Sequence, residues 1–155
     1  MNRIFADADV GRKNIGFGIV LFLILGVVIG IPLTVDFMGG SLLNGAQYQT
    51  WKIIHGYGVF LAFVNFFFGY CIDRVDLTRR QKEISSWSFV IAGLFGGIGR
   101  SVLFLMPSLG EIGNIINLVE TAGFVIGTYF FVYGQIRLRS TVQIEQPAPA
   151  AARPG

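Results

Sequence analysis

The chain has 155 residues, of which 53% are hydrophobic and 14% are charged, and its mean hydropathy is +0.63. This composition excludes an ordinary soluble domain and indicates an integral membrane protein. The formal net charge of +3 is explained by basic residues that gather on one side of the membrane, so it does not require a nucleic-acid partner. A single cysteine, Cys71, excludes an intramolecular disulfide and a cysteine cluster for zinc or iron–sulfur.

Four apolar runs are long enough to cross a hydrocarbon core, which takes about 20 helical residues. They cover residues 15–35, 53–72, 87–106 and 115–136. The sequence therefore predicts an all-α integral membrane protein whose one domain is a four-helix transmembrane bundle over residues 15–136. Residues 1–14 are predicted to be a cytoplasmic N-terminal arm. Residues 137–155, which end in a Pro- and Ala-rich stretch, are predicted to be a disordered cytoplasmic tail.

The first run follows Arg12 and Lys13, as the apolar part of a signal peptide would. It continues past the about 7 to 15 residues typical of such a segment and has no clear cleavage site, so we expect a membrane helix. Gly26 and Gly30 in this run are four residues apart, as are glycine pairs in the third and fourth runs. This spacing lets helix backbones approach closely and favours tight packing or a homo-oligomer.

The second run contains the chain's only histidine, His55, within the segment WKIIHGYG that starts at Trp51. From the residues alone, His55 is either a metal ligand or, more commonly at this depth, a hydrogen-bonded interfacial histidine. Lys52 stands just before it, near the outer surface. Asn65 lies deeper in the run and is either a catalytic group or an interhelical hydrogen-bonding group.

Charged residues are rare inside the last two runs. Arg100 lies about 10 Å before the outer end of the third run, and Asn117 and Glu120 lie in the first turns of the fourth. A charged side chain near the centre of a membrane helix costs at least about 2.5 to 3.5 kcal/mol, so such residues either pair or mark a functional site. We expect Arg100, Asn117 and Glu120 to share one depth with His55 and to converge in the outer half of the bundle.

The basic residues predict the orientation of the bundle. All Lys and Arg residues except Lys52 and Arg100 lie before the first run, between the second and third runs, or after the fourth. Because cytoplasmic segments collect Lys and Arg, both termini are predicted to be cytoplasmic. The expected location is the inner (cytoplasmic) cell membrane, which the chain crosses several times.

The segment from Trp51 to Gly58, at the start of the second of four membrane helices, resembles the styrene oxide isomerase family. The resemblance extends to helix order, chain length and charge orientation. It implies that His55 binds a heme b held between the subunits of a trimer. It also implies that the ferric iron acts as a Lewis acid on a small lipophilic epoxide, which rearranges to an aldehyde. The family's asparagine six residues after the histidine corresponds to Leu61 here, and its third-helix aspartate and tyrosine have no counterpart.

The residue types agree with a heme site. A neutral imidazole is a good axial ligand for heme iron, and 15 phenylalanines supply apolar surface for a porphyrin. Arg100 and Lys52 are candidates to neutralise the heme propionates, and Trp51 belongs to the same cofactor-binding segment. Three further residues are candidates to polarise the substrate: Glu120, Asn117 and Asn65.

Two other functions stay open at this point. A cytochrome-like or quinone-site subunit of a respiratory membrane complex would need a second axial ligand from another chain, because this chain has one histidine. A non-catalytic small transporter or accessory subunit would use Arg100 and Glu120 as structure or as a proton path.

Overall fold

The computed structural model describes residues 9–145, and this part of the chain is helical apart from short connections and contains no strand. The residues form four helices that are long and apolar enough to cross a membrane, as the sequence predicted. These spans are Arg12–Phe37, Gly45–Arg74, Arg79–Leu105 and Pro107–Ser140. The first eight residues of the predicted arm and residues 146–155 of the predicted tail lie outside the described residues.

Each span is built from shorter helical elements. The elements in chain order are α1 (Arg12–Leu21), η1 (Phe22–Val28), α2 (Ile29–Phe37), α3 (Gly45–Cys71), η2 (Ile72–Arg74), α4 (Arg79–Gly93), η3 (Leu94–Gly99), α5 (Arg100–Leu105), η4 (Pro107–Ile112) and α6 (Gly113–Glu145). Two of them, η1 and η3, are π-helical segments within the first and third spans. A π turn holds an extra residue and interrupts the regular α-helical pattern.

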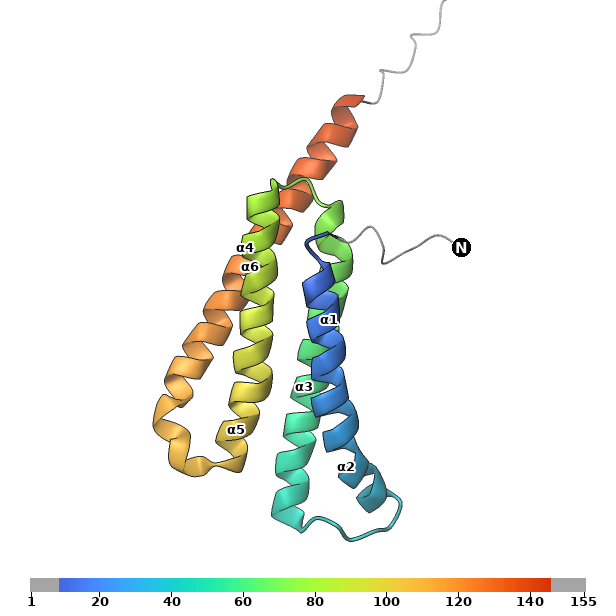
Figure 1. Cartoon of the computed structure of the whole chain (residues 1–155), viewed down its shortest axis with the longest axis vertical. Helices are drawn as coiled ribbons and strands as arrows, with labels where there is room; N and C mark the ends of the chain where they lie inside the picture. The colour runs from blue at the N-terminus through green and yellow to red at the C-terminus, as the bar shows by residue number, and fades with distance from the viewer. Residues whose placement is uncertain (1–8, 146–155) are drawn as a thin grey trace, which may run out of the picture.

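The four spans form two antiparallel hairpins that lie side by side (Figure 1). The first hairpin pairs α1 and α2 with α3, and the second pairs α4 and α5 with α6. The start of α1, the connection between α3 and α4, and the far end of α6 lie at the same end of the bundle. We call this the α4 end and the opposite one the α5 end. The two described chain ends are therefore at one end of the bundle, as an even number of antiparallel spans requires.

The helices extend beyond the apolar runs because polar residues form their ends. Asn44 caps α3 through a reciprocal pair of hydrogen bonds with Gln47, and Thr78 caps α4 in the same way with Gln81. At the other end of the chain, α6 continues to Glu145, so residues 137–145 of the predicted tail are helical.

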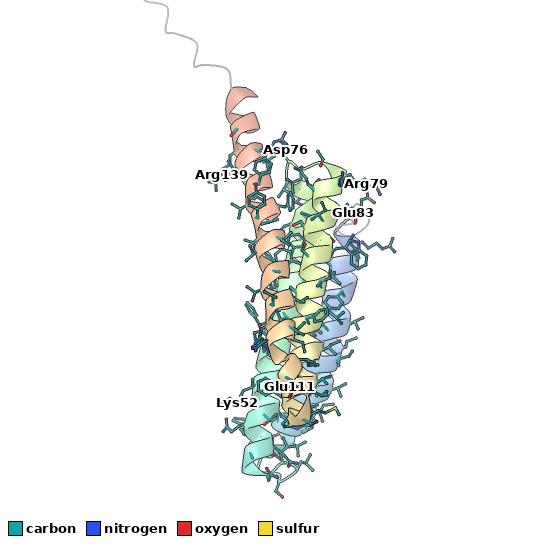
Figure 2. All side chains as sticks on the ribbon, turned by 90° about the vertical axis from the view of Figure 1, so that its left-hand side faces the viewer. Lys52, Asp76, Arg79, Glu83, Glu111 and Arg139 are labelled. Carbon is teal, nitrogen blue, oxygen red and sulfur yellow. The ribbon has the colours of Figure 1, made fainter. Side chains whose placement is uncertain are left out.

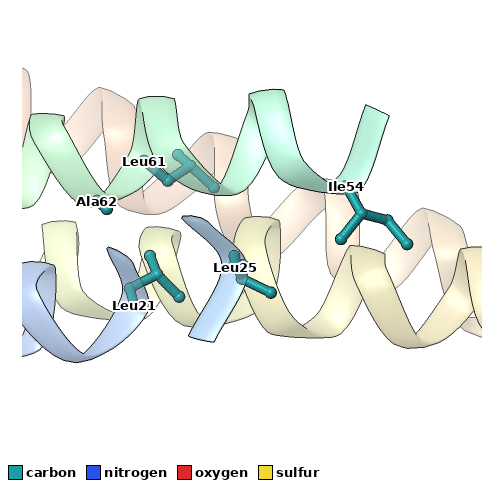
Figure 3. Close-up of a cluster of buried hydrophobic side chains, with 5 residues drawn as sticks. All are labelled: Leu21, Leu25, Ile54, Leu61 and Ala62. Carbon is teal, nitrogen blue, oxygen red and sulfur yellow. The ribbon is translucent and has the colours of Figure 1, made fainter. Parts of the chain in front are cut away.

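The core of the first hairpin is a cluster of aliphatic side chains between α1, η1 and α3 (Figure 3). Leu21, Leu25 and Leu61 are almost completely buried there, together with Ile54 and Ala62. Glycines on the facing helices make the close approach feasible. A Cβ atom at Gly18, for instance, would lie 2.7 Å from the backbone oxygen of Ala62. The absence of a side chain at Gly18 thus lets the backbones of α1 and α3 approach closely.

A buried polar network joins three helices near the α4 end. Asn14 donates to the Asn65 side chain at 3.3 Å and to the Ser86 backbone oxygen at 3.0 Å, and it accepts from the Ser86 hydroxyl. Asn65 also donates to the backbone oxygen of Leu61. All three polar side chains are fully buried. The network satisfies groups that would be costly without partners, and it ties α1, α3 and α4 together.

The glycine contacts predict a large difference between two substitutions in one helix. Gly18→Ala should lower the free energy of unfolding by about 1 to 3 kcal/mol, because the new methyl group meets backbone atoms of α3 that cannot turn aside. Gly16→Ala is the matched control, because no atom lies within 4 Å of its Cβ position. It should be neutral or slightly stabilising, since alanine is the better helix former. Thermal unfolding in detergent measures both, and equal effects would contradict the packing of α1 on α3.

Candidate functional site

Four polar side chains meet between the two hairpins, and we call them the Arg100 cluster. Arg100 donates from Nη2 to Glu120 Oε2 and to Asn117 Oδ1, each at 2.7 Å. The Tyr57 hydroxyl donates to Glu120 Oε1, and the Arg100 guanidinium carbon lies 4.9 Å from the centre of the Tyr57 ring. The Glu120 side chain is 5% exposed and that of Arg100 is 33% exposed. The cluster therefore has a buried carboxylate and a more accessible arginine.

Local backbone structure places these groups. Arg100 begins α5 directly after the π-helical segment η3, so the extra residue of the π turn sets the face on which it lies. Gly96 in η3 makes room for the acid, because a Cβ there would lie 2.6 Å from Glu120 Cδ. Asn117 and Glu120 are three residues apart on α6 and so share one face of that helix. A side chain at position 96 would therefore meet the Glu120 carboxyl group, which would have to shift from its place beside Arg100.

The charges of the cluster balance, but its hydrogen bonding is incomplete. The guanidinium and the carboxylate neutralise each other, which makes the pair tolerable in apolar surroundings. Among the described residues, Arg100 Nε is buried and has no hydrogen-bond acceptor. Asn117 lies at the surface of the bundle and uses its oxygen to accept from Arg100, so its amide nitrogen is left to donate elsewhere.

His55 faces a different part of the bundle. Its Nδ1 atom lies 3.2 Å from the backbone oxygen of Leu25 in η1. Because a carbonyl can only accept, Nδ1 is the donor in this bond, and in the neutral imidazole the lone pair then lies on Nε2. The ring packs against Gly30, where a Cβ would lie 3.0 Å from His55 Cε1. A groove of about 520 Å³ runs along this surface, which we call the His55 groove, and it is lined by α2, the end of η1 and His55.

The structure thus brings together only part of the predicted site. Arg100, Asn117 and Glu120 meet as expected, whereas the hydrogen bond of His55 goes to the first hairpin. The separation follows from helix geometry, because His55 and Tyr57 are two residues apart on α3 and so point to nearly opposite sides.

The other predicted site residues lie apart from the cluster. Asn65 is enclosed in the Asn14 network. Trp51 is half-buried one turn before His55, and Lys52 is exposed. In Figure 2, Lys52 and Glu111 both lie toward the α5 end, away from Asp76 and Arg139.

Tyr57 is the member of the cluster that the sequence analysis missed. It stands inside the segment that contains His55, but composition and motif do not indicate which way it faces. A signal was present in its spacing, because Tyr57, Phe60 and Val64 follow the i, i+3, i+7 pattern of one helix face. That face is the one that α3 turns toward α6.

Within residues 9–145, no group of three or more His, Cys, Asp or Glu side chains could hold a metal ion. A metal bound at His55 would therefore need most of its ligands from a cofactor such as a porphyrin. Comparisons with models of protein families, with curated proteins and with solved structures give no match.

The ion pair predicts non-additive effects of substitution. Arg100→Leu should destabilise the protein by about 3 kcal/mol, because Glu120 loses its counter-ion while still buried. Adding Glu120→Gln should restore much of that loss, since the neutral amide can keep a hydrogen bond with Tyr57. Arg139→Leu, which removes an exposed charge on α6, is the control and should change stability by less than about 0.5 kcal/mol. Additive losses in thermal unfolding would contradict the pairing.

Proposed function

We propose that the protein is a heme-binding integral membrane protein with His55 as the axial ligand of heme b. The observation that carries this proposal is the orientation of the imidazole, whose Nδ1 is held by the Leu25 carbonyl at 3.2 Å. Histidines that ligate metals generally donate their other ring N–H to a carbonyl or carboxylate in this way, which fixes the tautomer and the ring plane. Nε2 of His55 is the atom we assign to the iron.

The surroundings of His55 fit a flat apolar group. The His55 groove has a volume of about 520 Å³, which lies within the range of small-molecule sites, and its lining is mostly aliphatic. Gly26 and Gly30 line it without side chains that would stand in the way of a ring. Lys52 is exposed three residues before His55 and is the better candidate for a propionate, because Arg100 is already held by Glu120 and Asn117.

We further propose, from the resemblance to styrene oxide isomerases, that the protein isomerises a small lipophilic epoxide to a carbonyl compound. A heme with one protein ligand supplies an open iron site that can act as a Lewis acid. The chain's own part is to hold the group through His55, to orient that imidazole through Leu25, and to keep water out with apolar walls. The His55 groove is on the surface of the bundle, so a second copy of the chain, as in a homotrimer, is the proposed cover.

The proposed setting is the cytoplasmic membrane, with both described chain ends on the cytoplasmic side. Figure 2 places Arg79 and Arg139 at the α4 end, together with Asp76 and Glu83. Acidic residues there pair with basic ones, for example Lys13 with Glu83 and Arg137 with Asp76, but the basic residues are in excess. The rule that Lys and Arg collect on the cytoplasmic side supports this orientation.

A second function is favoured by the Arg100 cluster. A buried carboxylate bonded to an arginine and a tyrosine is an arrangement found in proton paths and in cofactor sites of membrane complexes. It supports a cytochrome-like or quinone-site subunit as the alternative, or a small transporter or accessory subunit without catalysis. A heme that cycles between ferrous and ferric states with a quinol would favour the first of these over an isomerase.

The heme proposal predicts a Soret band in the ultraviolet–visible spectrum of the detergent-purified protein expressed with ample heme. His55→Ala should abolish the band, and added imidazole should restore part of it by replacing the missing ligand. Gln49→Ala, an exposed change on the same helix, is the control and should leave the spectrum unchanged. A band that persists in His55→Ala, or no band in the folded native protein, would contradict the proposal.

The orientation predicts different labelling of two engineered thiols in intact cells. In a Cys71→Ser background, Gly110→Cys should react with a membrane-impermeant maleimide, because Gly110 lies in the connection at the α5 end with no atom within 4 Å of its Cβ position. Arg80→Cys, exposed at the α4 end, should react only after the cells are opened. The reverse pattern would show that the chain sits the other way round.

A further inference from the structure

A second groove, distinct from the His55 groove, lies on the side of α3 that faces the second hairpin. It has a volume of about 560 Å³ and is lined almost entirely by phenylalanines, and we call it the phenylalanine groove. Phe60, Val64 and Phe67 contribute from α3, Phe89 from α4 and Phe131 from α6. The lining offers flat apolar surface and essentially no polar group.

Contacts between α3 and α6 bracket this groove. Toward the α5 end, Tyr57 of α3 donates to Glu120 of α6. Toward the α4 end, the rings of Phe68 and Phe131 lie 5.4 Å apart. Between Tyr57 and Phe68, α3 rises about 16 Å, a length that suits a ring with a short side chain. The ring centres of Tyr57 and Phe60 are 6.4 Å apart, so one member of the Arg100 cluster lies beside a residue that lines the groove.

The Arg100 cluster at that end has hydrogen-bond donors without acceptors, and its charges are balanced. Among the described residues, Arg100 Nε is buried and has no acceptor. The Asn117 side chain accepts from Arg100 through its oxygen, so its amide nitrogen is left to donate to another group. The positive charge of Arg100 is already neutralised by Glu120. A second anion, such as a lipid phosphate, would be repelled by the Glu120 carboxylate, whereas a neutral oxygen acceptor would not be repelled.

The geometry points to the phenylalanine groove as a binding site for a neutral lipophilic molecule with a carbonyl oxygen at one end, of the quinone class. The carbonyl would accept from the exposed amide of Asn117, and the apolar body would lie along the phenylalanines. This site shares no lining residue with the His55 groove, so it does not depend on the proposed heme. It also gives a use to the Asn117 amide nitrogen, which pairing of Arg100 with Glu120 leaves unexplained.

Equilibrium dialysis of the detergent-purified full chain with a short-chain alkyl benzoquinone tests the assignment. The matched probe is benzene carrying the same alkyl chain, which keeps the apolar body and lacks the carbonyls. We expect the quinone to bind at least about tenfold more tightly than the alkylbenzene, because the free donors are satisfied only by the quinone. Equal binding of the two probes would overturn the assignment.

Variants locate the site. Asn117→Leu should weaken quinone binding by about two- to tenfold, whereas Leu118→Ala, an exposed change next to it on α6, should leave the affinity unchanged. Val64→Phe should abolish quinone binding by filling the groove. Phe67→Ala should weaken quinone binding, because it removes an exposed ring from the lining. Unchanged quinone affinity in both Asn117→Leu and Phe67→Ala would overturn the assignment.

The same measurements separate this site from the heme proposal. His55→Ala should bind the quinone as the native protein does, and Asn117→Leu should keep the Soret band if heme is bound. A protein that shows no Soret band and still binds the quinone would contradict the heme proposal and support the quinone site. Loss of quinone affinity in His55→Ala, with folding intact, would contradict a site separate from the His55 groove.

Discussion

The buried carboxylate of Glu120 is the group on which the arrangement of the helices most depends, because it pairs with Arg100 inside the second hairpin and accepts from Tyr57 of the first. In surroundings of apolar side chains, neither charge is tolerable alone, so α5 and α6 must stay in the register that joins them. Tyr57 extends the same requirement to α3 through its bond to the carboxylate. Near the α4 end, the Asn14 network does the same for α1, α3 and α4 with neutral groups. Apolar packing fills the space between these two levels, but it discriminates poorly between registers, and the polar contacts specify one.

The second span has a central role because its two faces carry different chemistry. One face presents His55 to η1 and the His55 groove, and the other presents Tyr57 and the phenylalanine groove to the second hairpin. A spacing of two residues along one helix therefore places His55 and Tyr57 on different sides without any domain boundary. The helix that carries both, α3, is continuous from Gly45 to Cys71.

Much of the fold could be predicted from apolar length, since about 20 such residues in each run suffice for a membrane helix. The helix ends could not, because Asn44 and Thr78 form caps outside the apolar runs. For the candidate site, the rarity of charged and polar residues deep inside the last two apolar runs was enough to select Arg100, Asn117 and Glu120. The contribution of Tyr57 and the separate orientation of His55 depend on how far each helix is rotated about its axis. That rotation is set by packing contacts, such as the one between Gly96 and Glu120, which a single sequence does not display.

The π-helical segment η3 gives the third span a place where a change in chain length can be absorbed. Because a π turn holds one residue more than an α turn, loss of a single residue between Leu94 and Gly99 would let the span continue as a regular helix. Arg100 would then keep nearly the same face and could still meet Glu120. Loss of a residue from an α-helical part of the span, between η3 and the start of α4, has no extra residue to draw on and would turn the following residues by about 100° about the helix axis. A one-residue deletion is therefore expected to be tolerated in η3 and to separate Arg100 from Glu120 when it falls in α4.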